Sequence, residues 1–494
     1  MTQVRDDRLE PALVRLIAVV LLGGMLGILN STMVAVAIGP LSQEFGTSLN
    51  TIGWASTGFL LAVTAMIPFT SWAVDRFGSK RMWTIGLLTF IGGTLACALA
   101  WGVGSLIAFR VVQGIGAGIL DPLVLVLLAR AAGPHRAGRV MGLMGVVLSL
   151  GPVLGPVVGG AVLQGLSWRW MFIFGLPLGL VALVLALKVI PTDPPRGGEE
   201  PFAKLDVVGL ALLGPGFAVL VLAMNQSAER NAFAVWQVLS PLILGAVMLL
   251  VYVVHALRER RSGPPLIDLR LFKSGSFTAS VTVMTLSGLA TFAGLFALPL
   301  YYQQVHGMGT LEAGLLVTPI GAGAALAMPL AGGLSDKIGS RSLAQGGAVV
   351  AAFGCFILTT VDADTSAVWS SVAALVVGLG LGFVGAPTMG SLYRTLPMHL
   401  VPQGSSVLYM LNQLGAAIGI ALVTVILKTI GDTDALKGIH GVYWFAIGTL
   451  AALFVATLFL PGRIEAPAAA QTGGSADDPQ PVSGQQSADA SSSH

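Results

Sequence analysis

Long stretches of apolar residues, separated by short polar segments, occupy most of the chain. Each stretch is close to or above the roughly 20 apolar residues that an α-helix needs to cross the hydrocarbon layer of a membrane. The ten-residue alternation that is typical of membrane β-barrel strands is absent. The pattern therefore predicts fourteen membrane-spanning helices, at about residues 14–39, 50–73, 82–101, 104–129, 140–164, 168–189, 206–224, 234–257, 276–302, 311–333, 342–360, 367–393, 403–428 and 440–461.

The composition excludes a soluble protein. Of the 494 residues, 55% are hydrophobic and only 10% are charged, whereas soluble proteins carry about 25% charged residues. The 64 glycines fit membrane helices, whose backbones approach closely at small residues. Cys97 and Cys355 lie in apolar stretches without metal-ligand spacing, so we expect two core residues and no metal site. The fold class is an all-α membrane protein, and the weak net charge of +3 does not indicate a nucleic-acid partner.

The placement of basic residues predicts the orientation of these helices. Of the 26 Lys and Arg residues, the loops opposite the termini hold only Arg169, Arg230, Lys428 and Lys437. Because cytoplasmic loops carry an excess of Lys and Arg, both termini are expected in the cytoplasm. The C-terminal tail is rich in Ala, Ser, Gly and Gln and is expected to be disordered.

Two pairs of segments resemble each other at similar offsets, 261 residues between Asp75 and Asp336 and 265 between Pro122 and Pro387. AVDRFGSKR (73–81) matches GLSDKIGSR (333–341), and GIGAGILDP (114–122) matches GLGLGFVGAP (378–387). Parallel repeats of this kind indicate two six-helix bundles around a central cavity. We predict a cytoplasmic N-terminus at 1–13, an N-terminal bundle at 14–190, a linker with an inserted helix pair at 191–265, a C-terminal bundle at 266–461 and the tail at 462–494.

Four motifs carry a resemblance to a known family. SWAVDRFGSK (71–80) is similar to the loop pattern G-x-L-A-D-R-x-G-R-K, with Ser71 and Ser79 as departures, and its second copy keeps Asp336 and Gly339. The pattern R-x-x-Q-G matches Arg110, Gln113 and Gly114. The pattern G-x-x-x-G-P-x-x-G-G matches without departure at Gly151, Gly155, Pro156, Gly159 and Gly160.

Over roughly residues 14–461 the chain resembles the major facilitator superfamily, in particular its fourteen-helix drug–proton antiporters. The resemblance implies a multidrug efflux protein, and the glycine motif marks exporters in that family. Such a protein confers antibiotic resistance and uses a proton gradient as its energy source, without a cofactor.

The loop motif has a physical interpretation as a cytoplasmic latch. Carboxylates at helix junctions can pair with Arg or cap a neighbouring helix, and such contacts can lock one arrangement of two bundles. The alternative is a set of solvated charges that only fix topology. The latch candidates are Asp75, Arg76, Gly78, Lys80 and Arg81 in the first copy, and Asp336, Gly339 and Arg341 in the second.

The glycine motif predicts a smooth groove on one helix. Gly151, Gly155, Gly159 and Gly160 are spaced so that most of them share one face, and Pro156 loosens the backbone. This suits a helix that packs closely and bends. General glycine-rich packing of membrane helices is the alternative.

Arg110 and Asp121 are the two charged residues well inside a predicted span. Charges within a membrane are costly and therefore point to function. The two residues are eleven positions apart, within about 20° of one helix face but ~16 Å apart along the axis. They can border one aqueous cavity, and we expect other polar side chains of the spans to line it or to bond neighbouring helices: Asn30, Thr32, Gln113, Asn412 and Gln413.

The family's usual proton carrier is absent from the first span. The pattern L-D-x-T reads Leu29, Asn30, Ser31 and Thr32, and the amide of Asn30 does not titrate. We therefore predict that Asp121 carries the proton and that Arg110 tunes the field of the cavity. The alternative is a structural Asp held at a helix kink before Pro122.

The chain lacks a glycine-rich nucleotide-binding loop and any cluster of catalytic residues. We therefore expect a proton-coupled secondary exporter of lipophilic small molecules rather than an enzyme. The alternative substrate is an endogenous lipid or secondary metabolite, and the remote alternative function is that of a transporter-like sensor. Neutral or weakly acidic substrates gain weight from Asn30 and Arg110. The expected setting is a monomer in the bacterial plasma membrane, with protons, membrane lipids and the small molecule as its partners.

Overall fold

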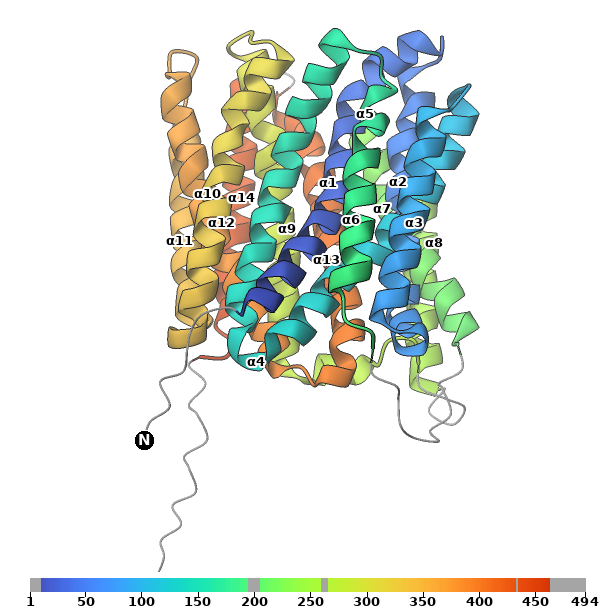
Figure 1. Ribbon diagram of the computed structural model, residues 1–494. Helices are drawn as coiled ribbons and strands as arrows, with labels where there is room; N and C mark the ends of the chain where they lie inside the picture. Colours follow the sequence, from blue (N-terminus) through green and yellow to red (C-terminus); the bar gives the residue numbers. More distant parts are fainter. Residues whose placement is uncertain (1–9, 194–204, 259–264, 432–433, 463–494) are drawn as a thin grey trace, which may run out of the picture.

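The computed structural model describes residues 10–193, 205–258, 265–431 and 434–462. Within these ranges fourteen helical segments are long and apolar enough to cross a membrane, which confirms the predicted number of spans. Helix α1 begins at the same end of the molecule at which α14 ends (Figure 1). We call this end the terminal face; the sequence predicts that it is cytoplasmic. Most of the predicted N-terminus (1–13) and tail (462–494) lies outside the described residues.

The elements follow one another along the chain with short connections. They are α1 (Pro11–Glu44), α2 (Leu49–Phe77), α3 (Ser79–Ala98), α4 (Val103–Gly165), α5 (Trp170–Ile173), α6 (Gly175–Val189), α7 (Val207–Arg230), α8 (Trp236–Arg258), η2 (Leu269–Lys273), α9 (Gly275–Gln304), α10 (Thr310–Ile338), α11 (Arg341–Leu358), α12 (Ala367–Thr395), η3 (Met398–Leu400), α13 (Val401–Gly431) and α14 (Ala435–Thr457).

Helix α4 contains two membrane spans, Val103–Gly133 and Arg136–Gly165. They meet at Gly133, whose φ of 65° lies in the region that favours glycine. The sequence predicted a longer connection, from about residue 130 to 139. The helices extend into that segment because their ends reach beyond the hydrocarbon layer, where charged residues are tolerated in helical conformation.

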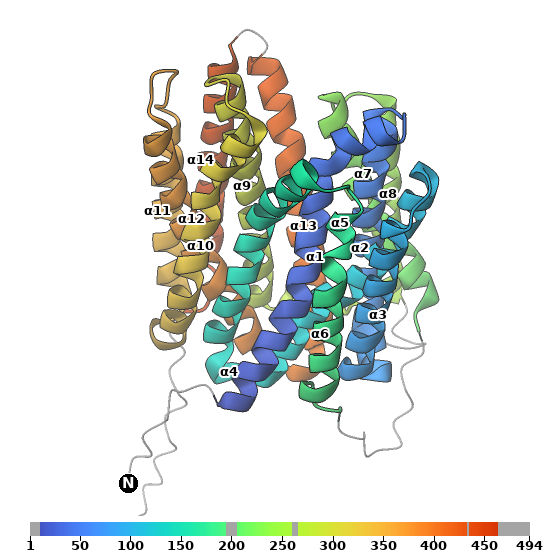
Figure 2. The same cartoon turned by 45° about the horizontal axis from the view of Figure 1, so that its top comes forward.

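The helices form two groups that lie side by side (Figure 2). On one side α1, α2 and α3 pack against α4, and α6 packs on α1 and α3. On the other side α12 packs against α10 and α11, while α9 packs against α13 and α14. The groups meet where α4 contacts α10 and α12, and where α2 contacts α13.

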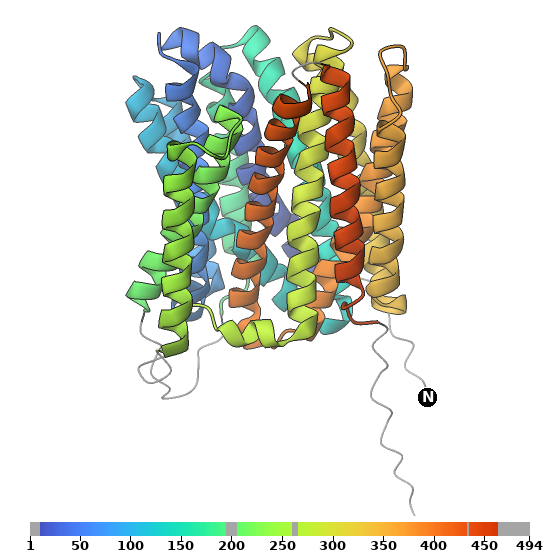
Figure 3. The same ribbon diagram turned by 180° about the vertical axis from the view of Figure 1, so that it is seen from behind.

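The inserted pair α7 and α8 lies at one of these meeting lines. Helix α7 packs against both α2 and α13, and α8 packs against α7 (Figure 3). Val221 and Met224 of α7 form an apolar cluster with Ala417 and Ala421 of α13. Helix α7 therefore covers the seam between α2 and α13.

The two groups share an apolar core near the terminal face. The largest cluster of buried apolar side chains joins Val74 and Met82, near the adjacent ends of α2 and α3, with Leu396, just after α12, and Val401, at the start of α13. A second cluster lies within the C-terminal group, and a third lies at the far end of the N-terminal group around Met33. The shared core therefore holds the groups together at the terminal face.

Candidate functional site

A cavity of about 420 Å³ lies between the two groups of helices. Its lining comes from α1, α2 and α4 on one side, from α9, α10, α12 and α13 on the other, and from α7 at the seam. Arg110 and Asp121 are the charged residues among its described lining residues. The polar residues that line it are Ser31, Thr32, Ser56, Thr64, Ser149, Asn225, Ser287, Thr291, Tyr409, Asn412 and Gln413.

Arg110 of α4 is fully buried and holds a network of neutral acceptors. Its Nη1 donates to Asn30 Oδ1 at 2.8 Å and to Gln113 Oε1 at 2.6 Å, and its Nε donates to the Ala55 carbonyl oxygen at 3.1 Å. Gln113 Nε2 in turn donates to Thr94 Oγ1 at 2.6 Å. Asn30 and Gln113 thus hold the guanidinium in place and bond neighbouring helices, and neither is among the described lining residues. Of the two roles that the sequence analysis offered, they have the contact between helices.

The amide at position 30 leaves the charge of Arg110 without a carboxylate partner among the described residues. An aspartate in the same place would form an ion pair with the guanidinium. Here the cation is stabilised by neutral oxygens and by the ring of Phe59, whose centroid lies 4.1 Å from the guanidinium carbon. The positive charge therefore acts on whatever enters the cavity.

Asp121 lies eleven residues further along α4, deeper toward the terminal face. Its carboxyl group interacts with the hydroxyl of Tyr409 on α13, so this contact joins the two groups of helices. Sequence analysis missed Tyr409. The available signal was its spacing: Tyr409, Asn412 and Gln413 stand at i, i+3 and i+4 and therefore share one face of α13.

The remaining polar candidates are partly used in helix contacts. Thr32 Oγ1 donates to the carbonyl oxygen of Ile28 in its own helix at 2.9 Å. Asn412 Nδ2 donates to the Met284 carbonyl oxygen of α9 at 2.8 Å. Both residues also line the cavity, as does Gln413. Thr32 and Asn412 therefore line the cavity and also form hydrogen bonds to helix backbone.

The glycine motif lies in the second span of α4 and faces α1. A Cβ atom at Gly151 would overlap the side chain of Ile28, and one at Gly155 would overlap the Thr32 hydroxyl. Gly159 lies against the backbone of Met33, with about 3.1 Å between a Cβ and the Met33 oxygen, while a Cβ at Gly160 would meet nothing within 4 Å. Close helix packing thus depends on the first three glycines. Pro156 lies in the same helical span, which remains helical through it.

The first copy of the loop motif contacts the end of the first α4 span. Arg130 Nη2 lies 3.8 Å from Asp75 Oδ1, and Arg130 Nη1 donates to Ser79 Oγ at 2.7 Å. Asp193 Oδ1 lies 3.8 Å from Arg130 Nη1, and its Oδ2 accepts from the Lys80 backbone N–H at 3.2 Å. These contacts join α2, α3 and α4 at the terminal face.

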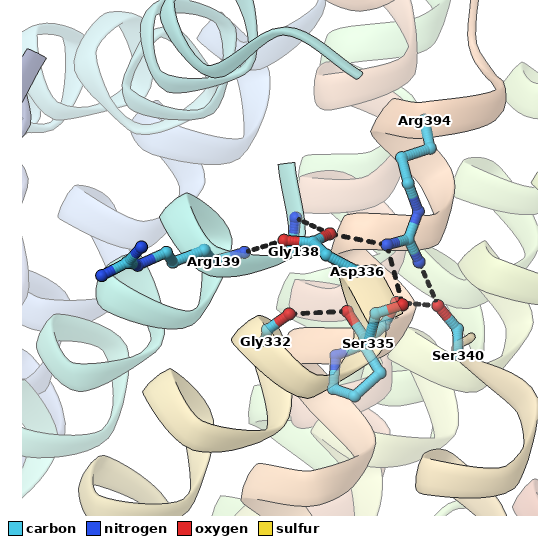
Figure 4. A network of polar contacts seen from close by, with 8 residues as sticks. Gly138, Arg139, Gly332, Ser335, Asp336, Ser340 and Arg394 are labelled. Atoms are coloured by element: carbon cyan, nitrogen blue, oxygen red, sulfur yellow. Dashed lines mark hydrogen bonds and ion pairs between the residues drawn. The ribbon is translucent and has the colours of Figure 1, made fainter. Parts of the chain in front are cut away.

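The second copy joins the two groups of helices directly (Figure 4). Asp336 Oδ1 accepts from the Gly138 backbone N–H at 3.1 Å, and Oδ2 accepts from that of Arg139 at 3.0 Å. Both N–H groups belong to the first turn of the second α4 span, where a carboxylate is favoured by unpaired donors and the helix dipole. Arg394, which belongs to α12, donates from Nη1 to Asp336 Oδ1 at 2.7 Å.

Arg394 was missed in the sequence analysis, although the repeat contains a signal for it. Arg394 follows Arg130 by 264 positions, close to the offset between the two motif copies. Each arginine pairs with the aspartate of its own copy and donates to the equivalent serine, Ser79 or Ser340. The repeat therefore extends to the ion pairs.

Other residues of the loop motif have different positions. Gly78 and Gly339 occupy matching turns with φ of 88° and 92°, which favour glycine. Arg76 and Arg81 are exposed. Arg341 Nε donates to a carbonyl oxygen just after α14 at 3.0 Å, so Arg341 tethers α11 within its own group of helices.

Comparisons with known proteins agree with this architecture. The chain is 37% identical over 424 residues to the multidrug resistance protein B homolog of Mycobacterium tuberculosis, covering 85% of this chain and 77% of that protein. It is 30% identical over 418 residues to the lincomycin resistance protein LmrB of Listeria innocua, covering 84% and 86%.

Solved structures show the same fold. The proton:xylose symporter XylE bound to 6-bromo-6-deoxy-D-glucose matches with a TM-score of 0.64 at 17% identity, over 91% of this chain and 96% of that one. The Major Facilitator Superfamily profile matches residues 20–420. With fourteen spans in its described part and with its transporter relatives, the chain is a transporter and not an enzyme, and it belongs to the major facilitator superfamily.

Proposed function

We propose that this protein is a proton-coupled secondary exporter of lipophilic small molecules in the bacterial plasma membrane, with both termini in the cytoplasm. The observation that carries the proposal is the largely apolar cavity between two groups of helices, in which Asp121 is the one carboxyl group among the described lining residues. The names of the relatives, multidrug resistance and lincomycin resistance proteins, support export of drugs.

The contacts at the terminal face support an alternating-access cycle. Asp336 and the shared apolar core join the two groups of helices on the predicted cytoplasmic side. We expect these contacts to keep the cavity closed on that side, so their release would open it there. Export then requires that the latch opens to load substrate and closes before substrate leaves on the opposite side.

Asp121 supplies the coupling in this proposal. Its carboxyl group interacts with Tyr409 across the two groups of helices, so a change in its protonation changes a contact between them. Proton binding also removes a negative charge from the cavity. A substrate that depends on this charge is therefore displaced by the proton, which is the exchange that an antiporter needs.

The test is transport by the purified protein in liposomes under an imposed pH difference. Cationic, neutral and anionic lipophilic dyes are supplied together with a lumenal pH indicator, and a lipophilic metabolite extract serves as the competing substrate source. We expect substrate-dependent proton flux in the wild type and its loss in Asp121→Asn. Asp364→Asn, which alters an exposed carboxylate between α11 and α12, is the matched control and should retain the flux.

Two outcomes would contradict the proposal. Coupling at the wild-type level in Asp121→Asn would remove Asp121 from the mechanism while leaving transport intact. Substrate binding without any movement of substrate or protons would instead favour a sensor built on a transporter fold.

A further inference from the structure

The guanidinium of Arg110 has a donor that the protein leaves unused. Arg110 lines the cavity and has no solvent exposure, yet its Nη2 has no hydrogen-bond partner among the described residues. A buried charged donor without an acceptor is costly, and an oxygen that reaches it recovers that cost. The other two guanidinium nitrogens are already bonded, to Asn30, Gln113 and a backbone carbonyl.

A second unused donor lies in α2, in the residue after the one that Arg110 contacts. The Ser56 hydroxyl is buried without a hydrogen-bond partner among the described residues and also lines the cavity. Arg110 Nε donates to the carbonyl oxygen of Ala55, the residue that precedes Ser56 in α2. The chain therefore brings two unpartnered donors, one of them charged, to the same wall of the cavity. Such a pair matches the oxygens of an acid group.

The opposite charge lies further along the same helix. Asp121 follows Arg110 by eleven residues, which corresponds to ~16 Å of helix rise on nearly the same face. The described lining between and around them is polar at isolated positions and otherwise apolar, and it holds no third charge. The cavity thus has a positive site and a negative site separated by an apolar surface.

We propose that the cavity binds amphoteric amphiphiles: small molecules whose carboxylate, sulfonate or phosphate group binds Arg110 and Ser56 and whose protonated amine faces Asp121. The role of Asp121 in this assignment rests on the function proposed above. A purely anionic substrate would bind better, not worse, after Asp121 takes up a proton. Competition between proton and substrate therefore requires the positive group, and the unused donors at Arg110 require the acid group.

Three matched ligands test this assignment: ciprofloxacin, which carries both a carboxylate and an amine, its ethyl ester, which lacks the acid, and its N-acetyl derivative, which lacks the amine. Equilibrium binding to the purified full-length protein is measured at neutral pH without a proton gradient. We expect the wild type to bind ciprofloxacin about tenfold or more tightly than either derivative, the effect of one lost hydrogen bond to a charged group.

The variants assign each preference to its residue. Arg110→Gln should abolish the preference for the acid over the ester and keep the preference for the free amine, whereas Asp121→Asn should do the reverse. Ser56→Ala should weaken only the acid preference. Controls outside the lining are Arg169→Gln, whose guanidinium carbon lies 4.4 Å from the Trp168 ring centroid, and Ser280→Ala, which removes another buried unpartnered hydroxyl.

Equal binding of the acid and the ester by the wild type would overturn the proposal without any variant. An acid preference that survives in Arg110→Gln would also overturn it. Because Arg110→Gln can lose stability, Arg110→Lys is a second variant that keeps the charge: it should retain a reduced acid preference. Absence of proton-driven transport alongside these binding preferences would refute the proposed function and leave the binding assignment standing.

Discussion

Replacing Asp336 with asparagine tests the latch at the terminal face. Each carboxylate oxygen accepts one backbone N–H from the opposite group of helices, from Gly138 and from Arg139. Asparagine has one acceptor oxygen, so one N–H would keep a neutral hydrogen bond and the other would face an NH₂ group. The ion pair with Arg394 would also be lost. The ion pair lies within the C-terminal group, between α10 and α12, so its loss affects that group in either arrangement. The changes at the two N–H groups of α4 weaken the arrangement in which the two groups are in contact.

The size of the effect follows from the number of contacts. A hydrogen bond to a charged group contributes about 1.5–3 kcal/mol and a neutral one about 0.5–1.5 kcal/mol. One charged bond is lost, at about 1.5–3 kcal/mol, and the other becomes neutral, at about 1–1.5 kcal/mol, so the closed arrangement should lose about 2.5–4.5 kcal/mol. The Asp336 side chain is only 15% exposed, so salt screens little of this. The population with an open terminal face should rise by about 60- to 1,600-fold relative to the closed one.

The assay measures the distance between fluorescent labels on the two groups of helices. Labels at Arg81 and at Met398, both exposed at the terminal face, report its opening in a background without the native cysteines. Asp364→Asn should leave the distances unchanged. Gly138→Val should separate the labels, because a Cβ there would overlap Asp336 and neighbouring groups. The latch would be refuted if the distance between the labels were the same in Asp336→Asn and in the wild type while it increased in Gly138→Val.

Two further predictions concern the cavity. Gly155→Val should reduce transport at least tenfold, because its side chain would overlap the Thr32 hydroxyl; Thr32→Ala in the same protein should restore part of the rate, and equal rates for single and double variants would contradict the steric reason. Tyr409→Phe should retain substrate binding but lower the number of protons moved per substrate in liposomes, because it removes the hydroxyl that interacts with Asp121 across the helix groups; unchanged coupling would remove Tyr409 from the mechanism.

The helices were predictable because hydrophobicity is a property of each segment by itself. The ends of the spans were less predictable. Residues 130–139 contain basic residues, two glycines and a proline, which together indicate a loop, whereas most of these residues extend the helices on either side of Gly133. The repeat of the loop motif was detectable because Asp75 and Asp336 are followed by the same residues, Gly and then Ser, at matching positions. The local sequence was therefore sufficient to predict the helices and the internal repeat.

The partners within the site depend on how the helices are rotated against one another, which a single sequence does not state. Arg110 and Asn30 were both identified, yet their hydrogen bond across α1 and α4 was not. Tyr409 was overlooked because a tyrosine in an apolar span is usually a packing residue. Arg394 was overlooked because it read as a charge that fixes topology, although its repeat position matches Arg130.

The position of α7 makes the two lateral boundaries of the transporter unequal. Along one boundary α4 and α10 touch directly, while along the other α7 stands between the bilayer and the contact of α2 with α13. Val221 and Asn225 of α7 reach the cavity lining. A compound dissolved in the lipid on that flank therefore meets an additional helix before the cavity. Helix α7 thus lies between this flank and the cavity, and we expect substitutions at Val221 or Asn225 to change the entry of lipid-dissolved compounds from that side.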